Sequence, residues 1–306
     1  MNVPAINLGA KPRVVFISTM HGNGWGGSEE LWGRTAERLI KGNRAQVLAH
    51  LSYFPEPVRQ REELRAIGCA IETGHPNRLR HLVSRRVVTA LGMGRKPYLV
   101  RARPDLVVIS QGAHFDGAAW MIECADRKIP YAAVSHCFVE GHPFADTHTD
   151  PLRRGYEESL RSYFVSEANL RDTRRQIATP LAQGRVVRNP CNVPFTAAPE
   201  WPEPKDGVFR IATVARLDTV VKGHDILMEV LNSPKWKARP LHVSLYGKGT
   251  NENSLKRLKA MYGLDNVTFM GTTNDVEGIW RDHHALVLTS RWEGLPLAVV
   301  EAMLCG

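Results

Sequence analysis

Short apolar runs separated by helical stretches organise residues 11–189. Val14 to Ile17 is the first of these runs, and the pattern predicts further strands at 46–51, 69–72, 105–110, 131–134 and 162–165. Unbroken apolar runs of this length are typical of strands that are buried on both faces. Their alternation with helical stretches predicts an α/β domain built on a doubly wound parallel sheet.

The same alternation resumes after a stretch that is rich in proline. Strands are expected at 209–214, 241–246, 267–269 and 285–288, with helices between them. The proline-rich stretch, residues 190–207, can neither pair regularly in a sheet nor continue a helix, which indicates an interdomain linker. The sequence therefore predicts two Rossmann-like domains, an N-terminal domain over 1–189 and a smaller C-terminal domain over 208–306.

A glycine-rich turn follows the first predicted strand. Ser28 is expected to cap a helix that runs from there to a stop at Gly42. Gly26 and Gly27 let the backbone approach an anion closely, so the strand, turn and helix together suit a phosphate. A loop of this kind is more often only a tight turn, and it is not the G-x-G-x-x-G fingerprint of a dinucleotide dehydrogenase.

Two cations follow the strand that is predicted to end at Val214. Arg216 and Lys222 both lie in the loop before the next helix. An arginine binds a diphosphate through a bidentate fork and a lysine binds it as a point charge. One surface cation would be unremarkable, but two cations at the carboxyl end of a strand can clamp a diphosphate and stabilise its negative charge.

Two carboxylates flank the start of the last predicted helix. Glu293 is expected in the loop before this helix and Glu301 about one turn inside it, because Pro296 suits a first helical turn. Free N–H groups at the helix start suit a phosphate, and the carboxylates suit hydroxyl groups. An isolated surface glutamate is usually only a solvated residue. The backbone expected to contribute belongs to Gly294, Leu295, Pro296 and Leu297.

Several polar residues come just after predicted strands of the N-terminal domain, where ligands gather in doubly wound sheets. A lone histidine in such a place is more often a structural hydrogen-bonding group than a ligand contact. The candidates for the cleft are His21, Gln111, His114, Ser135 and His136.

The spacing of Glu293 and Glu301 around Gly-Leu-Pro resembles that in the retaining glycosyltransferases of family four, which have the two-domain GT-B fold. The Arg-Leu and Lys-Gly segments at Arg216 and Lys222 resemble the diphosphate-binding motif of the same family. The resemblance spans nearly the whole chain and is most specific over 213–306. It implies that Arg216 and Lys222 hold the diphosphate of a nucleotide-sugar donor. It also implies that Glu301 holds ribose hydroxyls and that Glu293 contacts the sugar.

The resemblance implies further donor contacts in both domains. Gly26 and Gly27 would line the donor cleft, and His136 would lie near the sugar. Gly247 would lie where the chain passes the nucleotide, and the loop at Met270 and Gly271 would contact the base through its backbone. No residue stands out as a covalent nucleophile, which agrees with the family, and the sequence contains no metal-binding cluster, so no cofactor and no metal site are expected.

The net positive charge of the chain favours an anionic partner. The chain of 306 residues has 40 Lys and Arg against 31 Asp and Glu, a formal charge of +9. Residues 78–103 are strongly basic, with apolar side chains at helical spacing. This segment is either an ordinary helix with a basic solvent face or a patch that docks on an anionic membrane or an acidic acceptor. It carries no nucleic-acid-binding motif, so nucleic acid is not an expected partner.

The sequence predicts a cytoplasmic location, either free or peripheral at the inner face of the membrane. No run approaches the ~20 apolar residues of a membrane span, and residues 1–11 lack the apolar core of a signal peptide. The five cysteines are widely spaced, as expected for reduced, packed thiols.

The predicted function is that of a hexosyltransferase that moves a sugar to an acceptor hydroxyl with retention of configuration. The acceptor could be a glycan, a lipid-linked molecule or a small molecule, in the synthesis of surface polysaccharide, glycolipid or a related glycan. The alternatives are a sugar-nucleotide epimerase or phosphorylase of the same fold, or a non-catalytic nucleotide-sugar-binding fragment. Because the chain stops at Gly306, directly after the motif helix, a truncated second domain of uncertain activity is expected.

Overall fold

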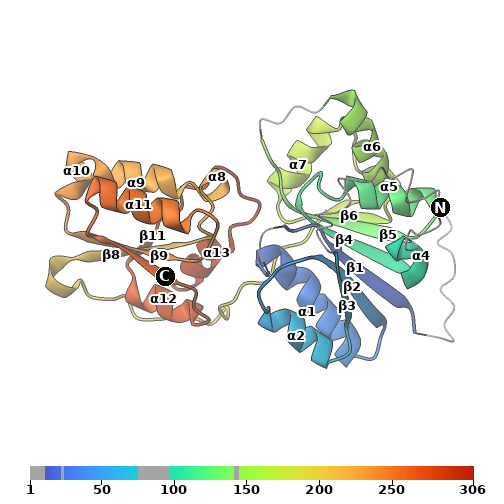
Figure 1. The fold of residues 1–306 in the computed structure, drawn as a ribbon, viewed down its shortest axis with the longest axis horizontal. Helices are drawn as coiled ribbons and strands as arrows, with labels where there is room; N and C mark the ends of the chain where they lie inside the picture. Colours follow the sequence, from blue (N-terminus) through green and yellow to red (C-terminus); the bar gives the residue numbers. More distant parts are fainter. Residues whose placement is uncertain (1–10, 22–23, 75–96, 141–144) are drawn as a thin grey trace. The chain divides into compact units, whose positions relative to one another are not determined.

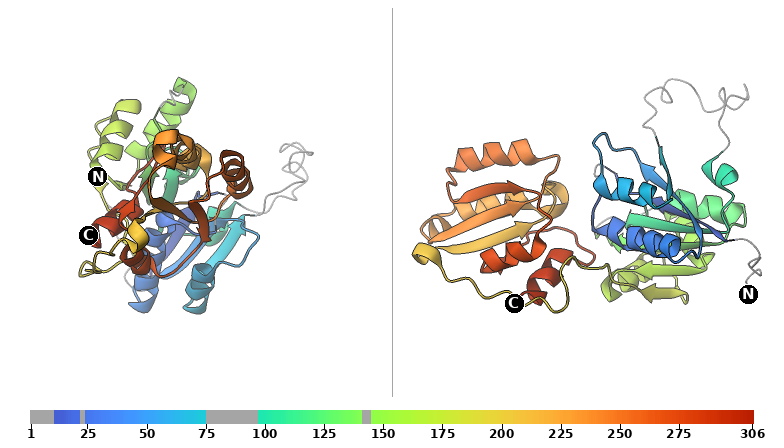
Figure 2. Two further views of the ribbon diagram at one scale, coloured as in Figure 1. Left: turned by 90° about the vertical axis from the view of Figure 1, so that its left-hand side faces the viewer. Right: turned by 90° about the horizontal axis from the view of Figure 1, so that it is seen from below.

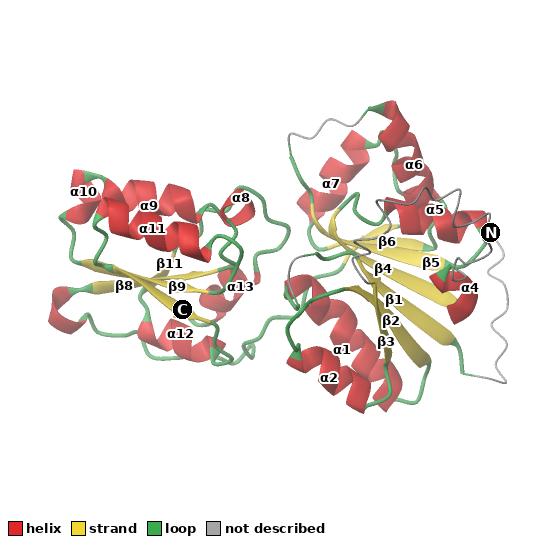
Figure 3. Cartoon of the chain, viewed as in Figure 1, coloured by secondary structure: helices red, strands yellow, loops and turns green. Residues whose placement is uncertain are grey.

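The computed structural model of the protein describes residues 11–21, 24–74, 97–140 and 145–306 (Figure 1). The chain forms two compact units, residues 1–189 and 190–306. Each unit contains one parallel sheet with helices on both of its faces (Figure 3). The α/β class with two parallel sheets, predicted from the alternation of apolar runs and helical stretches, is confirmed.

The sheet of the N-terminal unit has seven strands in the order β3-β2-β1-β4-β5-β6-β7. Every strand that the sequence predicts is present, with its ends shifted by a few residues, and the short β7 was not expected. All the pairings are parallel. The strands are β1 (Arg13–Ser18), β2 (Gln46–Ser52), β3 (Ala70–Gly74), β4 (Leu106–Ala113), β5 (Tyr131–Cys137), β6 (Arg161–Phe164) and β7 (Gly184–Val186).

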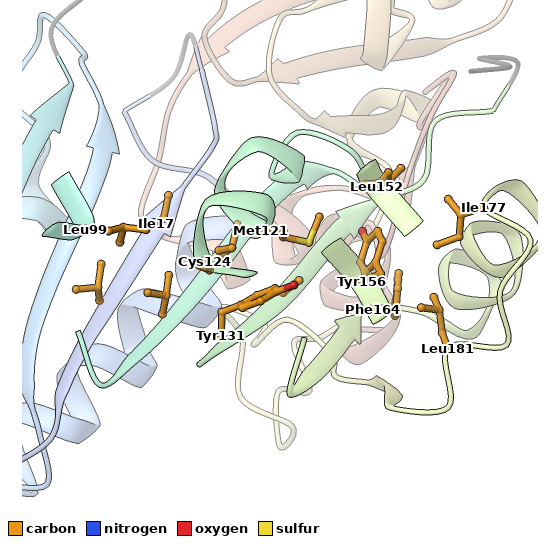
Figure 4. Close-up of a cluster of buried hydrophobic side chains, with 14 of the residues drawn as sticks. Ile17, Leu99, Met121, Cys124, Tyr131, Leu152, Tyr156, Phe164, Ile177 and Leu181 are labelled. Carbon is orange, nitrogen blue, oxygen red and sulfur yellow. The ribbon is translucent and has the colours of Figure 1, made fainter. Parts of the chain in front are cut away.

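Helices cover both faces of this sheet, with α1 and α2 on one side and α5, α6 and α7 on the other (Figure 1). Alternate side chains of β1 serve the two faces, since Phe16 packs against Trp32 of α1 while Ile17 belongs to the cluster that contains Met121 (Figure 4). The helices are α1 (Gly27–Lys41), α2 (Arg59–Ala66), α4 (Tyr98–Ala102), α5 (Ala118–Asp126), α6 (Asp146–Glu157) and α7 (Glu167–Gln176).

The first helix begins earlier than the sequence predicts. Gly26 is the N-cap residue of α1, and no side chain caps the helix. Ser28, which was expected to be the cap, lies in the first turn, and its Oγ donates to Glu29 Oε2 at 2.5 Å. The predicted Ser28 cap is therefore wrong, because the serine hydroxyl binds a carboxylate instead of a backbone N–H. The predicted end at Gly42 is confirmed.

The sheet of the C-terminal unit has four strands in the order β10-β9-β8-β11, all parallel. Figures 1 and 2 show α9, α10 and α11 on one face of it and α12 and α13 on the other. The strands are β8 (Phe209–Val214), β9 (Leu241–Tyr246), β10 (Val267–Gly271) and β11 (Ala285–Leu286). The helices are η1 (Lys205–Gly207), α8 (Thr219–Lys222), α9 (His224–Asn232), α10 (Pro234–Lys237), α11 (Glu252–Tyr262), α12 (Val276–Asp282) and α13 (Leu297–Leu304).

The strand expected at 285–288 is shorter and less buried than predicted. Only Ala285 and Leu286 are in β11, and Ala285 is exposed. Backbone bonds flank this strand, from His284 N to Arg210 O at 2.8 Å and from Val287 N to Ala212 O at 2.9 Å. Since β11 stands last in the strand order, its outer edge has no strand partner among the described residues, which leaves its side chains partly exposed.

The proline-rich stretch contributes to the core of the second unit. Val193 is buried in a cluster with Ala212 of β8, Trp280 of α12 and Ala298 of α13. Residues 190–207, expected to act as a linker, are thus part of the C-terminal unit at their beginning. No described helix combines the length and the hydropathy that are needed to cross a lipid bilayer.

The strand order reverses once in each sheet, between β1 and β4 in the first unit and between β8 and β11 in the second. Chain connections leave in opposite directions at such a point, which opens a crevice beyond the carboxyl ends of the two strands. The fold therefore singles out the segments after β1 and β4, and those after β8 and β11, as places for ligands.

Candidate functional site

Lys222 and Glu293 lie side by side in the C-terminal unit. Lys222 is the last residue of α8, in the connection after β8, and Glu293 lies in the loop between β11 and α13. The Lys222 Nζ donates to Glu293 Oε1 at 2.7 Å. The two side chains are partly buried, with exposed fractions of 17% and 26%. The strand reversal thus joins two predicted site residues that are 71 positions apart in the sequence.

A glycine makes this close approach of the two loops feasible. Gly223 has a left-handed φ of +62°, and a Cβ atom there would lie 2.0 Å from the carbonyl oxygen of Thr289. Only glycine avoids both the backbone strain and the collision. The Lys-Gly pair recognised in the sequence therefore combines a charged group with a backbone position that no other residue can occupy without rearrangement.

The predicted nucleotide-contacting segments meet at the carboxyl ends of β8, β9 and β10. Gly247 has φ +138°, and a Cβ there would lie 2.0 Å from Ala215 O. The Gly247 N–H donates to Gly271 O at 2.7 Å. Next to Ala215, the half-buried Arg216 makes no side-chain hydrogen bond or ion pair with any residue that the structure describes. Met270 is 47% exposed.

The start of α13 offers backbone donors without a competing side chain. Pro296 is the N-cap residue, one position before the first turn in which it was expected, and no side chain caps the helix. The first turn contains no acidic residue. The N–H groups at the start of a helix have no intrahelical partner and carry partial positive charge. The segment from Gly294 to Leu297 can therefore present donors to an anion.

The second glutamate of the motif is already engaged. Glu301 is buried on α13, and its Oε1 accepts from both the backbone N–H and the Nδ2 of Asn192, each at 2.9 Å. This pair fastens the proline-rich stretch to the motif helix. Sequence reasoning missed Asn192, because the two residues are 109 positions apart and no local pattern links them. The other oxygen, Oε2, accepts no hydrogen bond within the described part of the chain.

In the N-terminal unit the structure brings the glycine turn and His136 together through Ser110 of β4. The Ser110 Oγ lies 3.5 Å from Ser28 O, next to Gly26 and Gly27, and 3.0 Å from His136 Nε2. Burial lowers the pKa of His136 to about 4, with the Asn189 side chain acting in the opposite direction. The imidazole is therefore neutral at neutral pH.

The buried carboxyl group of Glu29 supports the glycine turn through hydrogen bonds. Glu29 accepts hydrogen bonds from Ser18 Oγ at 2.6 Å and from Ser28 Oγ at 2.5 Å. Burial raises the pKa of Glu29, which the two serines and the nearby Arg61 partly oppose. Sequence reasoning missed Glu29, because Ser28 looked like a capping residue. Its hydrogen bonds tie the first turn of α1 to Ser18 at the end of β1.

The other polar candidates of this unit have structural roles. Gln111 donates to the Tyr156 hydroxyl at 2.7 Å and accepts from Gly117 N at 2.8 Å. His114 is fully buried and is hydrogen-bonded to Gln176. His21 Nδ1 lies 2.9 Å from Ser52 Oγ. These contacts agree with the expectation that most polar groups after a strand satisfy the fold itself.

Most of the basic segment 78–103 lies outside the described residues. Within its described end, Arg101 forms a bidentate pair with Glu72 at 2.7 and 3.1 Å. Across the described ranges, no group of three or more His, Cys, Asp or Glu side chains is arranged to hold a metal ion.

Comparisons with known proteins identify the C-terminal unit. Residues 208–306 match the model of the family "Glycosyl transferases group 1". An uncharacterized glycosyltransferase of Haemophilus influenzae is 38% identical over 86 residues, which are 28% of this chain. The chain thus spans about a quarter (24%) of the length of that relative.

Solved structures resemble the chain over nearly its whole length. Anabaena HepE in complex with UDP and glucose has a TM-score of 0.67 at 18% identity, covering 96% of this chain and 78% of HepE. Sucrose-phosphate synthase from Thermosynechococcus elongatus has a TM-score of 0.65 at 17% identity, covering 96% and 79%. At these identities the similarity shows the fold. The C-terminal unit therefore matches the group 1 glycosyltransferases over residues 208–306, and the two Rossmann-like units of the chain have the GT-B fold.

Proposed function

We propose that this protein transfers a sugar from a nucleotide-diphosphate sugar to an acceptor hydroxyl with retention of configuration. The observation that carries the proposal is the 2.7 Å contact between Lys222 and Glu293 at the carboxyl ends of β8 and β11. A sugar nucleotide has a diphosphate directly beside a ring of hydroxyls. An ammonium next to a carboxylate complements that junction, since the cation attracts phosphate and the carboxylate accepts from hydroxyls.

Arg216 and Lys222 are the proposed diphosphate ligands. Two fixed cations stabilise the negative charge that builds up on the nucleotide diphosphate as the bond to the sugar breaks. The Arg216 guanidinium has its donors available, because none of them is bonded to another described residue. The N–H groups of Gly294, Leu295 and Leu297 would add backbone donors to the same anion.

The two glutamates are proposed to bind different parts of the donor. Glu293 would accept from hydroxyls of the transferred sugar, next to the phosphate that Lys222 holds. Glu301 would accept from ribose hydroxyls through Oε2, while Asn192 fixes Oε1. Gly247, Met270 and Gly271 would contact the nucleotide base through their backbone, since their strand ends are joined by the bond from Gly247 N to Gly271 O.

The N-terminal unit is proposed to contribute the acceptor side and the remaining donor contacts. Gly26 and Gly27 would allow close approach of the donor, and the neutral imidazole of His136 would hydrogen-bond a sugar hydroxyl without adding charge. The acceptor is proposed to be a glycan, a lipid-linked molecule or a small molecule. A lipid-linked acceptor would agree with contact between 78–103 and an anionic membrane, at the inner face of which a cytoplasmic enzyme would work.

UDP is the first nucleotide to test, because Anabaena HepE was crystallised with UDP-glucose. A thermal-shift panel of UDP, GDP, ADP and their common sugar conjugates, with and without Mg²⁺, should show stabilisation by one nucleotide series. A ligand that binds only the folded state raises its stability by mass action, by about 2.7 kcal/mol at a hundredfold excess over Kd. A protein that responds to no member of the panel would contradict the proposed function.

Lys222→Ala should weaken binding of the selected nucleoside diphosphate by roughly 10- to 100-fold, the effect of losing one hydrogen bond to a charged group. Isothermal titration calorimetry measures the Kd. Lys235→Ala is the matched control, since Lys235 is an exposed lysine of α10 in the same unit. Equal losses in the two variants would mean that only the net charge matters and that Lys222 is not a specific ligand.

Glu293→Gln should have opposite effects on the bare nucleotide and on sugar transfer. The Glu293 carboxylate partly neutralises the Lys222 ammonium at 2.7 Å, so its removal leaves more positive charge for a diphosphate. UDP should bind roughly 3- to 10-fold more tightly, while the rate of sugar transfer or of donor hydrolysis falls. Unchanged affinity for UDP would show that the ion pair does not compete with the ligand.

Glu301→Gln should remove discrimination between ribose and deoxyribose. The substitution keeps an acceptor toward Asn192 but loses the charge that Oε2 offers to a hydroxyl. The wild-type protein should bind UDP more tightly than its 2′- or 3′-deoxy analogues by about tenfold. The variant should bind them almost equally. If the preference for UDP survives the substitution, another residue holds the ribose.

A further inference from the structure

Two loops carry the charged groups of the candidate donor site. The Lys222 loop is the connection at residues 219–225, made of α8, Gly223 and the first two residues of α9, and the Glu293 loop consists of residues 289–293. Binding of one donor by both Lys222 and Glu293 requires a fixed spacing of these loops, because a lysine and a glutamate side chain each have several rotatable bonds. The residues that set this spacing are neither Lys222 nor Glu293.

Arg291 connects the Glu293 loop to the Lys222 loop at three places. Its Nη1 donates to Asp225 Oδ1 at 2.9 Å and its Nη2 donates to Asp225 Oδ2 at 2.8 Å, which makes a bidentate pair. Nη1 also donates to Thr219 O at 2.6 Å. The backbone N–H of Arg291 donates to Val221 O at 2.8 Å.

A further bond comes from the residue two positions earlier. The Thr289 Oγ1 donates to Gly223 O at 2.7 Å. Together with the contacts of Arg291, the bonds reach residues 219, 221, 223 and 225, on both sides of Lys222. The loop that carries the cation is therefore attached along its whole length to the loop that carries the carboxylate.

The ion pair between Arg291 and Asp225 is too exposed for its main role to be stabilisation of the fold. The exposed fractions of the two side chains are 37% and 40%, and ion pairs in such positions add little to the free energy of unfolding. The hydrogen bond from Arg291 lowers the pKa of Asp225, so this carboxylate is ionised at neutral pH. What the planar fork does provide is a defined geometry between two loops.

We propose that Arg291 and Asp225 are positioning residues for the nucleotide-sugar donor. Their bidentate pair holds the Lys222 loop and the Glu293 loop at a fixed spacing. At this spacing the Lys222 ammonium binds the diphosphate while the Glu293 carboxylate binds the sugar. This inference rests on the proposed function. The guanidinium is mostly committed to protein oxygens, since both N–H groups of Nη1 and one of Nη2 are used, and it therefore acts through the loops instead of binding the phosphates.

The test compares the Kd for UDP, or for the nucleotide that the thermal-shift panel selects, with the thermal stability of each variant. Arg291→Ala and Asp225→Ala should each weaken nucleotide binding about tenfold, because a small displacement of positioned groups is costly. The double variant should be no weaker than the poorer single variant, as expected for two residues that act as a unit. The Tm of the unliganded protein should change little. Arg291→Lys keeps the charge but loses the fork, so its affinity should be intermediate.

Arg154→Ala is the matched control. Arg154 is an arginine of comparable exposure in the N-terminal unit, where it pairs with Asp126 at 2.9 Å and with Glu158 at 2.7 Å. Its loss removes the same charge and a similar surface ion pair, so its affinity for UDP should stay within about twofold of the wild type.

The sign of the effect of Asp225→Ala separates positioning from direct binding. If Arg291 itself bound the phosphates, removing Asp225 would free a cation, and nucleotide affinity would stay the same or increase. That result would overturn the proposal, as would a loss of Tm in proportion to the loss of affinity. If the proposed function itself is wrong, neither the wild type nor any variant will bind a nucleotide. The positioning role would then fall with it, because nothing would be left to position.

Discussion

The approach of two backbone segments at the carboxyl ends of β8 and β11 governs the candidate site. Gly223 lies so close to the carbonyl of Thr289 that no side chain fits between them. This contact allows α8 and the loop before α13 to share hydrogen bonds, and it brings Lys222 to 2.7 Å from Glu293. The charge pair that carries the functional argument is therefore a consequence of backbone packing at the reversal of strand order.

The contact between the Lys222 ammonium and the Glu293 carboxylate makes the affinity of the site depend on which groups a ligand offers. An ammonium beside a carboxylate attracts a diphosphate less strongly than a free ammonium does. A ligand that also offers hydroxyls to the carboxylate recovers that loss. In the proposed function, such a pair would favour a sugar nucleotide over the bare nucleotide that remains after transfer, and so would help the enzyme to release its product.

In the N-terminal unit, buried polar groups that hydrogen-bond to one another fix the candidate residues. Glu29 accepts from Ser18 and Ser28, and Ser110 links the glycine turn to His136. Buried polar groups are costly without partners, so this network fixes the turn between β1 and α1 in one conformation. A neutral His136 at its end suits contact with uncharged hydroxyls.

Local sequence patterns were enough to predict the α/β class, the division of apolar runs between two sheets and the residue types at the strand ends. These features are local, since a strand needs only a short apolar run and a turn needs only its glycines. Tertiary structure decided the partners. The pairing of Glu301 with Asn192 spans 109 positions, and that of Arg291 with Asp225 spans 66. No local pattern encodes such contacts, because they arise only when the strand order brings distant loops to the same edge of a sheet.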